Sequence, residues 1–411
     1  MKKVVVIGGG AAGLMAATVA GEKGLKVTII ERNERPARKV MITGKGRCNV
    51  TNDTDVNGLV AAVTNKNSGR FLYTAFNAFS AEDTKEFFES SGVRLKTERG
   101  NRVFPVSDKS VDIVDALVNA ARRSGVMILN DRVVSLEISD GKVNGVKTES
   151  GKIIEADAVV VATGGLSYPL TGSTGDGYTL AKQAGHTVTE LCPSLVPVTV
   201  KEGWCSELQG LSLKNISVKV FVADSGKQVY TDFGELMFTH YGLSGPVILS
   251  ASAYMRDVEV KGYKVVIDLK PALEEEKLEK RILRDFSENS NKDFINSLGE
   301  LLPRKMIPVI VRLSGIEPSR KVNQITREQR LNLVKLLKNL TLNVNGFRPI
   351  EEAVITKGGV KLSEIDPKTM KSKLVEGLYF AGEVLDADAF TGGFNLQIAF
   401  STGFVAGNNI E

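Results

Sequence analysis

Short apolar runs open the chain and predict a strand, a helix and a second strand within the first 31 residues. Val4–Ile7 and Val27–Ile30 are rich in β-branched residues, as strands buried in a parallel sheet are. Leu14–Ala20 lies between them and consists of residues that suit a helix. This order predicts a β-α-β unit, the building block of doubly wound α/β domains.

Alternating helix and strand patterns continue to about residue 191. Ser80 and Asp83 have the spacing of a capping box, which predicts a helix that runs to about Ser91. A second helix is expected over Val111–Arg123, before Gly125. Further elements are predicted as strands at 126–129, 133–138, 142–148, 152–155 and 156–163, and as a helix from 175 to near 185.

After about residue 191 the pattern changes twice. Segments 194–200, 216–223 and 264–269 alternate or are rich in β-formers, with glycine and proline between them, which predicts a barrel-like sheet. A charged block then predicts helices at 273–286, 292–302, 304–314 and 326–340, the last opened by a capping box at Thr326 and Gln329. Beyond Gly346 an α/β pattern returns, with a strand in 376–383 and a closing helix over 394–405.

These patterns predict an α/β protein of three parts. A Rossmann-type domain comprises residues 1–191 and 346–411, so that both ends of the chain close it. A β-rich, barrel-like domain of residues 192–270 and 336–345 is inserted into it. A helical domain of residues 271–335 is inserted in turn into the barrel.

Composition is that of an ordinary globular protein. The chain has 411 residues, of which 42% are hydrophobic and 25% charged, so disorder is not expected. The glycine-rich N-terminus without an A-x-A cleavage site argues against a signal peptide, and no apolar run suits a membrane span. Cys48, Cys192 and Cys205 form no C-x-x-C pair, which argues against a zinc ribbon or a redox dithiol. We therefore expect a cytoplasmic protein without a metal.

Positive charge is concentrated near the N-terminus, although the net charge is only +5. Arg35, Arg38, Lys39, Lys45 and Arg47 lie in a stretch without acidic residues. Such a run is usually a solvated face. Because this one directly follows the predicted β-α-β unit, an anionic ligand nearby is the better interpretation.

The loop between the first strand and helix carries a dinucleotide motif. Gly8, Gly10 and Gly13 give G-x-G-x-x-G, with Ala11 and Ala12 between them. The glycines allow a tight turn, a close approach of pyrophosphate and close helix packing, and the helix N-terminus attracts phosphate.

An acidic residue at the end of the second strand completes the motif. Glu31 stands where a carboxylate can bind both ribose hydroxyls, and it would repel a 2′-phosphate. FAD or NAD therefore fits better than NADP. The neighbouring candidates for cofactor binding are Arg32, Lys39 and Val133.

Three later glycine-rich segments fit one flavin site together, although each alone is an ordinary turn. They end a buried strand, end the last strand and open the closing helix, whose N-terminus can stabilise an anionic flavin edge. Their candidate residues are Ala162, Thr163, Gly164 and Gly165, then Gly382 and Glu383, then Gly393, Asn395, Leu396 and Gln397.

Longer motifs make the chain resemble a known family. Thr43–Asn52, Phe238–Pro246, Thr356–Val360 and the region 377–403 are similar to signatures of the YhiN/BaiN-like (aminoacetone-oxidase-like) FAD-dependent flavoproteins. The resemblance covers essentially the whole chain and implies non-covalent FAD, a Rossmann-type domain and two inserted domains. It also places a loop beside the flavin ring, with candidates Thr43, Gly44, Gly46, Arg47, Cys48 and Asn49.

Candidates for proton transfer are few. His240 and Tyr241 lie in a motif punctuated by glycine and proline, where either could donate a proton or be structural. Cys48 has no partner cysteine in sequence, so a redox role is the weaker interpretation. A second dinucleotide motif is absent from the sequence, so NAD(P)H would dock transiently or another donor would serve.

Three functions remain open at this point. The first is an FAD oxidoreductase that exchanges hydride at flavin N5 with a small or medium organic substrate. The second is an FAD-dependent RNA-modifying enzyme, which would bind phosphates through the basic run; the modest net charge makes nucleic acid the less expected partner. The third is a flavin-loaded redox sensor or binding module without turnover. The sequence predicts no oligomeric state.

Overall fold

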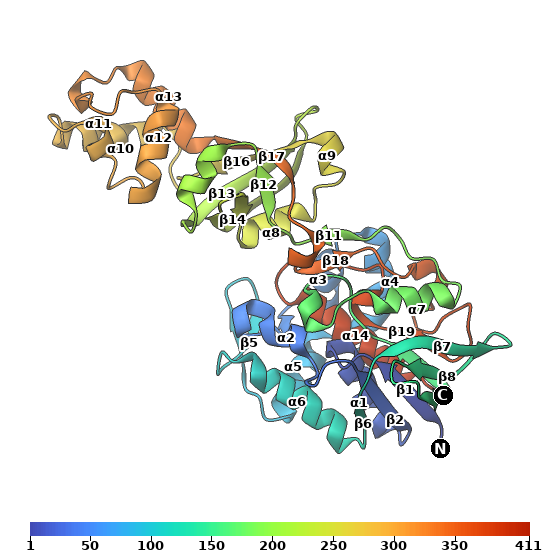
Figure 1. The fold of residues 1–411 in the computed structure, drawn as a ribbon. Helices are drawn as coiled ribbons and strands as arrows, with labels where there is room; N and C mark the ends of the chain where they lie inside the picture. The colour runs from blue at the N-terminus through green and yellow to red at the C-terminus, as the bar shows by residue number, and fades with distance from the viewer. The chain divides into compact units, whose positions relative to one another are not determined.

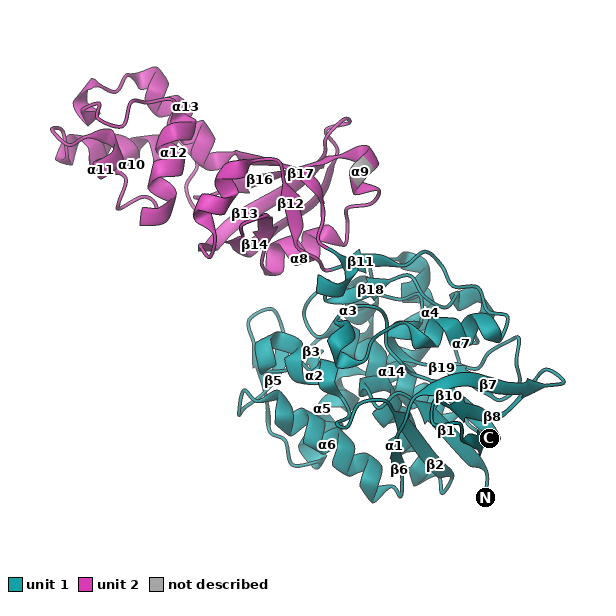
Figure 2. Cartoon of the chain, viewed as in Figure 1, with its two compact units in different colours: residues 1–194, 349–411 teal, residues 195–348 magenta. Residues whose placement is uncertain are grey.

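The computed structural model describes residues 1–411 with the exception of Glu259. Figure 2 shows two compact units, of which unit 1 is Met1–Ser194 with Pro349–Glu411 and unit 2 is Leu195–Arg348. In the part of the chain that is described, no helix combines the length and the apolar character needed to cross a bilayer.

Unit 1 is built on a parallel sheet in the order β19-β10-β1-β2-β6 (Figure 1). Its strands are β1 (Lys3–Ile7), β2 (Lys26–Glu31), β6 (Met127–Asn130), β10 (Ala158–Val161) and β19 (Leu378–Phe380). Val5 and Val159 lie side by side in the centre and are buried, because a parallel sheet is covered on both faces. Since β19 comes from near the C-terminus, both ends of the chain close this domain, as the sequence predicts.

Two helices pack closely over this sheet and form the base of the site. They are α1 (Ala11–Glu22) and α14 (Phe394–Asn408). A Cβ on Gly403 or Gly407 would overlap the backbone of Ala12 or Ala16, so only glycine permits this approach.

Further helices and strands complete unit 1. Ser80 and Asp83 form the expected capping box, in which the Ser80 N–H donates to Asp83 Oδ2 at 2.7 Å. The helices are α2 (Arg38–Ile42), α3 (Val56–Ala61), α4 (Lys66–Ala78), α5 (Ala81–Ser90), α6 (Ser110–Arg123) and α7 (Asp176–Gln183). The remaining strands are β3 (Thr51–Asn52), β4 (Leu95–Glu98), β5 (Arg102–Pro105), β7 (Val133–Ser139), β8 (Lys142–Thr148), β9 (Ile153–Glu155), β11 (Cys192–Ser194) and β18 (Ile355–Lys357).

Unit 2 contains a closed antiparallel barrel, β12-β15-β14-β13-β16-β17. Its strands are β12 (Val198–Val200), β13 (Ser212–Val222), β14 (Gln228–Phe238), β15 (Gly242–Ser244), β16 (Tyr263–Asp268) and β17 (Leu340–Phe347). Two short helices, α8 (Pro246–Ser252) and α9 (Val258–Lys261), belong to the barrel part. The barrel encloses alternate apolar residues such as Val218 and Val265, which are fully buried.

A helical lobe stands at one end of this barrel (Figure 1). It contains α10 (Glu275–Glu288), α11 (Phe294–Ser297), α12 (Ile307–Ser314) and α13 (Arg327–Lys338). The capping box predicted at Thr326 and Gln329 is present. Buried residues of the lobe and the barrel form one continuous apolar cluster.

Three of the predicted elements that differ from the structure have a clear physical reason. Segment 194–200 is divided between the end of β11 and the strand β12, because Leu195 has a left-handed backbone (φ 55°) and Pro197 follows. The helix expected over 292–302 is limited to Phe294–Ser297, since Gly299 and Pro303 disfavour continuation. The last helix of the lobe ends at Lys338 rather than 340, because Leu340 begins β17.

Candidate functional site

A pocket opens at the carboxyl ends of β1, β2, β10 and β19, which is where open α/β sheets bind ligands. Of the predicted cofactor residues, this pocket brings together Gly8, Gly10, Ala11, Ala12, Glu31, Arg32, Lys39, Thr43, Val133, Ala162, Thr163, Gly164, Gly382, Glu383, Asn395 and Leu396. The predicted residues outside its wall are Gly13, Gly44, Gly46, Arg47, Cys48, Asn49, Gly165, Gly393 and Gln397.

The glycines of the first loop have distinct physical tasks. Gly8 has φ +98°, and a Cβ there would lie 2.7 Å from the carbonyl oxygen of Ala162. A Cβ on Gly13 would overlap the carbonyl oxygen of Gly8, so Gly13 serves helix packing rather than the pocket wall. A Cβ on Gly10 would meet no atom within 4 Å, and Gly10 directly precedes the first turn of α1. The backbone here leaves room for a phosphate beside a helix N-terminus.

Glu31 is almost completely buried and already oriented. Its Oε2 accepts the Gly9 N–H at 2.7 Å, and its Oε1 accepts the backbone N–H and the side-chain Nδ2 of Asn33, each at 2.8 Å. A carboxylate has about four acceptor sites, of which these three bonds use three, so one remains for a ribose hydroxyl. The N–H donors fix the carboxylate in place before any ligand binds.

An ion-pair network forms another part of the pocket wall. Arg132 donates to both carboxylate oxygens of Asp176 at 2.9 Å, and Arg32 donates to Thr174 at 2.5 Å and to Asp176 at 3.3 Å. Burial raises the pKa of Asp176, but the arginines prevail and the pKa lies below its ordinary value. Asp176 therefore stays ionised and holds both guanidinium groups in position.

A lysine, a serine and a glutamate meet on the other side of the pocket. Lys39 Nζ lies 2.6 Å from both Ser167 Oγ and Glu383 Oε2, and the Thr356 N–H donates to Glu383 Oε1 at 2.9 Å. The side chains of Lys39 and Glu383 are 22% and 12% exposed. Lys39 thus neutralises a mostly buried carboxylate, and Gly165 packs against Thr356 and Glu383 behind them.

The loop after α2 has a strained backbone. Gly44, Lys45, Gly46 and Cys48 all have positive φ. Residues other than glycine seldom adopt this conformation, and such strain clusters at functional sites.

Only part of this loop lines the pocket. Thr43 does, whereas Arg47 forms ion pairs with Glu98 at 2.5 Å and Asp108 at 2.6 Å and lies 4.2 Å from the centre of the Phe104 ring. Acids distant in sequence thus hold the Arg47 guanidinium group, and its predicted role in cofactor binding stays a prediction. Gly46 is likewise outside the pocket wall.

Cys48 is fully buried, and burial raises the pKa of its thiol to about 12. The thiol is therefore protonated near neutral pH, where a thiolate would be required for nucleophilic or redox chemistry. Its neighbour Asn49 has a buried Oδ1, and Thr163 in the pocket wall has a buried Oγ1; neither atom has a hydrogen-bond partner among the described residues.

Two features of the pocket bear on which ligand fits. The open backbone at Gly10 and the oriented carboxylate of Glu31 together fit a ribose–pyrophosphate ligand such as FAD. The buried Thr163 hydroxyl lies against Gly177 of α7, and it is not open to the pocket.

The closing helix α14 reaches the pocket with its first turn. Asn395 and Leu396 line the wall, whereas a Cβ on Gly393 would overlap the backbone of Thr51, which makes Gly393 a packing glycine. Gln397 is buried and bonds to Thr51 at 2.6 Å and Thr84 at 2.8 Å, so its amide holds the helix rather than a ligand.

His240 and Tyr241 lie in unit 2, between β14 and β15. Their rings meet edge to face with centroids 4.8 Å apart, and the guanidinium of Arg348 lies 4.5 Å from the Tyr241 ring centre. His240 is exposed. The proton-donor role predicted for one of them stays a prediction.

Several pocket residues were missed by the sequence-based reasoning. The Gly172–Asp176 stretch carries a readable signal, because its glycines and acid resemble a turn that opens a helix on a ligand. Val354 and Ile355 carry none, since apolar residues beside a short strand look like core. The missed residues are Ile7, Ile30, Asn33, Ala37, Arg38, Val40, Asp131, Arg132, Thr171, Gly172, Ser173, Asp176, Val354, Ile355, Ala381 and Ala399.

Comparisons with known proteins agree with this fold and pocket. The family model described as HI0933-like protein Rossmann domain matches residues 2–409. A 3-dehydro-bile acid delta(4,6)-reductase of Clostridium scindens is 32% identical over 99% of this chain and 98% of its own length. A ribosomal RNA dihydrouridine synthase of Escherichia coli is 30% identical over 99% and 97%, respectively.

Solved structures show the same fold. A 3-ketosteroid delta1-dehydrogenase from Sterolibacterium denitrificans aligns with a TM-score of 0.54 and 13% identity over 99% of each chain. A 3-ketosteroid-delta4-(5alpha)-dehydrogenase from Rhodococcus jostii aligns with a TM-score of 0.51 and 15% identity, over 99% of this chain and 97% of its own.

Proposed function

This chain belongs to the HI0933-like family and is an FAD-dependent oxidoreductase, and from that premise we propose that it reduces a C=C bond conjugated to a carbonyl group. The names of two relatives support this choice. One reduces a dehydro-bile acid at delta(4,6), and the other forms dihydrouridine in ribosomal RNA. In both, the reduced double bond is conjugated to a carbonyl. The hydride is therefore added to the carbon remote from the carbonyl, and the proton to the carbon next to it.

The observation that carries the proposed binding of FAD is the pocket with its preformed polar contacts. We propose that Glu31 holds the adenosine ribose and that the first turn of α1 binds the pyrophosphate. We further propose that Arg32 and Arg132 bind at the adenosine end and that the first turn of α14 favours an anionic flavin edge. When bound, FAD supplies hydride chemistry at N5.

The protein must supply the proton that the carbon next to the carbonyl receives. We propose His240 or Tyr241 for this task, because imidazole and phenol groups serve as general acids in enzymes and both residues lie in a motif that resembles the family signature. The ion pair of Lys39 and Glu383 is less suited to donate this proton, since each partner already neutralises the other.

Two carriers of the double bond are candidates. The first is a free small or medium organic molecule, as in the bile-acid relative. The second is a uracil base within RNA, as the names of two relatives at 30% and 31% identity suggest. We propose NADH or NADPH as a transient electron donor in either case.

Anaerobic reduction of the purified protein tests this proposal. We expect one nicotinamide donor to bleach the flavin band near ~450 nm, and a conjugated enone or a uridine-containing RNA to restore it. Saturated analogues of the same compounds serve as matched controls and should leave the flavin reduced. If neither class of alkene reoxidises the flavin faster than its saturated analogue, the proposed reaction is wrong.

A further inference from the structure

The net positive charge of the chain resides entirely in unit 2. Unit 1 has 30 Lys and Arg residues against 30 Asp and Glu residues and is neutral. Unit 2 has 23 against 18, a net charge of +5. The modest overall charge, which argued against a nucleic-acid partner, therefore conceals an uneven distribution.

Within unit 2 the charge is segregated again. Residues 301–338, which contain α12 and α13, have nine basic and two acidic residues, a net charge of +7. Residues 271–300, which contain α10 and α11, have five basic and eight acidic residues, a net charge of −3. A surface that only needs to be soluble intersperses the two signs, whereas binding surfaces for polyanions separate them.

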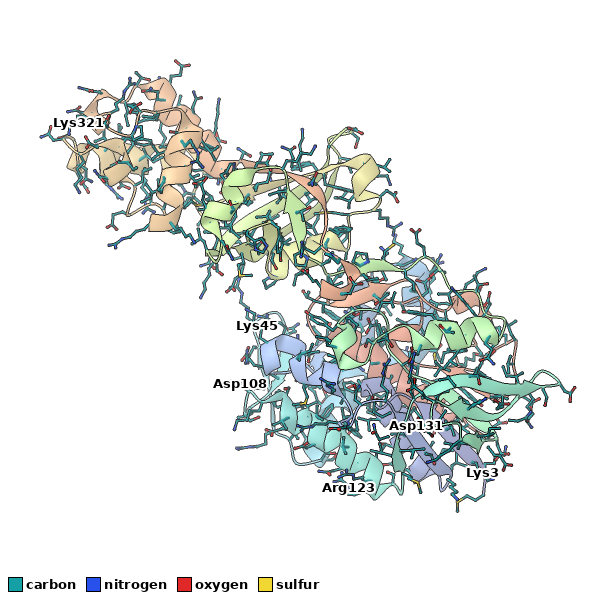
Figure 3. All side chains as sticks on the ribbon, viewed as in Figure 1. Lys3, Lys45, Asp108, Arg123, Asp131 and Lys321 are labelled. Atoms are coloured by element: carbon teal, nitrogen blue, oxygen red, sulfur yellow. The ribbon has the colours of Figure 1, made fainter. Side chains whose placement is uncertain are left out.

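Four exposed cations of segment 301–338 have no carboxylate partner within ion-pair distance among the described side chains: Arg304, Lys305, Arg327 and Lys335. Other cations of the same segment do have one, since Arg312 pairs with Glu207 at 2.8 Å and Lys321 (labelled in Figure 3) with Asp293 at 2.7 Å. We call these four residues the basic lobe surface; of them, Lys305 also donates from Nζ to the carbonyl oxygen of Gln209.

Helix geometry directs this surface outward. Arg327 and Lys335 are eight residues apart on α13, which places them on one side of the helix about 12 Å apart. The opposite side of α13 packs into the lobe through Leu333 and Leu337, both fully buried. Arg304 and Lys305 form the exposed turn that leads into α12.

We infer that the basic lobe surface binds the phosphate backbone of RNA. Lys and Arg bind phosphates without reading the base sequence. Binding also releases counterions from the RNA, which favours the complex and makes surface cations effective binding groups. The inference deepens and rests on the proposed function, because it selects RNA as the carrier of the reducible base. The surface positions the chain on RNA and takes no part in the reduction.

RNA binding by the full-length, FAD-loaded protein tests this inference without turnover. The probe is a fluorescein-labelled RNA hairpin with a uridine-containing loop, titrated at several salt concentrations. Four phosphate contacts predict a slope of log affinity against log salt of about −3 for single-stranded RNA. In the variant R327E/K335E we expect the slope to fall by about 1.4 and the affinity to fall at least tenfold.

A matched control separates a local surface from net charge. R122E/R123E reverses two exposed arginines at the end of α6 in unit 1 and alters the total charge equally (Arg123 is labelled in Figure 3). Its RNA affinity should stay within about threefold of the original protein (under 0.7 kcal/mol), with unchanged thermal melting of both variants. The inference would be overturned if both variants lost RNA affinity equally or if the salt slope were near zero. It would also be overturned if the protein bound phosphatidylglycerol vesicles through the same residues in preference to RNA.

The proposed reaction can fail independently. Flavin reoxidation by a free conjugated enone should proceed equally in the original protein and in R327E/K335E. Loss of RNA binding with retained enone reduction supports the inference, whereas RNA binding without reduction of any alkene removes the proposed reaction and leaves the surface in place.

Discussion

Two basic regions of this chain look alike in sequence but differ in structure. In unit 1, Arg35 pairs with Asp115, Lys39 with Glu383, and Arg47 with Glu98 and Asp108. In unit 2, the residues of the basic lobe surface form no ion pair with any described carboxylate. The density of positive charge along a sequence therefore does not reveal whether a ligand is needed to balance it, because the balancing acids can come from anywhere in the chain.

The difference assigns separate tasks to the two units. In unit 1, Lys39 and Arg47 of the basic run are held by acids at the cofactor pocket and at its neighbouring loop, although Arg38 and Lys45 form no ion pair among the described residues. In unit 2, the basic lobe surface is left available to solvent and ligands, although Arg312, Lys321 and Lys338 are paired.

The sharpest test concerns proton transfer in unit 2. We expect His240→Ala or Tyr241→Phe to slow reoxidation of the reduced flavin by substrate about 10²–10⁴-fold, the usual contribution of a positioned general acid. Flavin content and reduction by the donor should change far less. Stopped-flow measurement of the two half-reactions separates these effects, and unchanged rates in both variants would make the motif structural.

The second test removes an internal cation of unit 1. In Lys39→Met the mostly buried carboxylate of Glu383 loses its partner, and the free energy of unfolding should fall by about 3 kcal/mol. Chemical denaturation of the FAD-free protein measures the loss. The double variant K39M/E383Q, which removes both charges, should recover much of it, and a failure to recover would show that Lys39 acts through something other than this pair.

A third test concerns the acid at the end of β2. Glu31→Arg should weaken FAD binding by about 1.5–3 kcal/mol, because a hydrogen bond to a charged group is lost. Equilibrium titration of FAD-free protein with FAD gives the value, and Glu34→Arg, an exposed acid three residues away, is the matched control. If both variants bind FAD as the original protein does, Glu31 is not the ribose acid.

The smallest effect is expected at Arg47. Its ion pairs are about one third exposed, so Arg47→Met should cost no more than about 1 kcal/mol of stability. FAD affinity should stay the same, since the guanidinium lies outside the pocket wall. A tenfold loss of FAD affinity would restore the original expectation that Arg47 serves the flavin, and would blur the contrast between the two basic regions.

Much of the fold was accessible from sequence because its determinants are local. The β-α-β unit follows from apolar runs and from glycines such as Gly8 and Gly13, at which a Cβ would have no room, and both capping boxes follow from fixed spacing. The family expected from the motifs is confirmed. The short helix α11 was overestimated because buried leucines without helical structure give the same apolar pattern as a helix face.

The site was less accessible because its polar groups find partners across the chain. Arg132 and Asp176 are 44 residues apart, and Lys39 and Glu383 are 344 apart, so nothing near either residue indicates the pair. Arg47 shows the converse. Its sequence context favours an anionic ligand, and only the tertiary fold brings Glu98 and Asp108 to it.

The nested order of the chain also governs how the protein is made. Strand β10 ends at Val161, but its neighbour β19 begins only at Leu378. At a synthesis rate of about 5–20 residues per second, β10 waits about 10–40 s on the ribosome with one edge open. Unit 2 lies wholly within that interval, so it can fold first, while the nascent cofactor domain depends on chaperones or on speed to avoid edge-to-edge association.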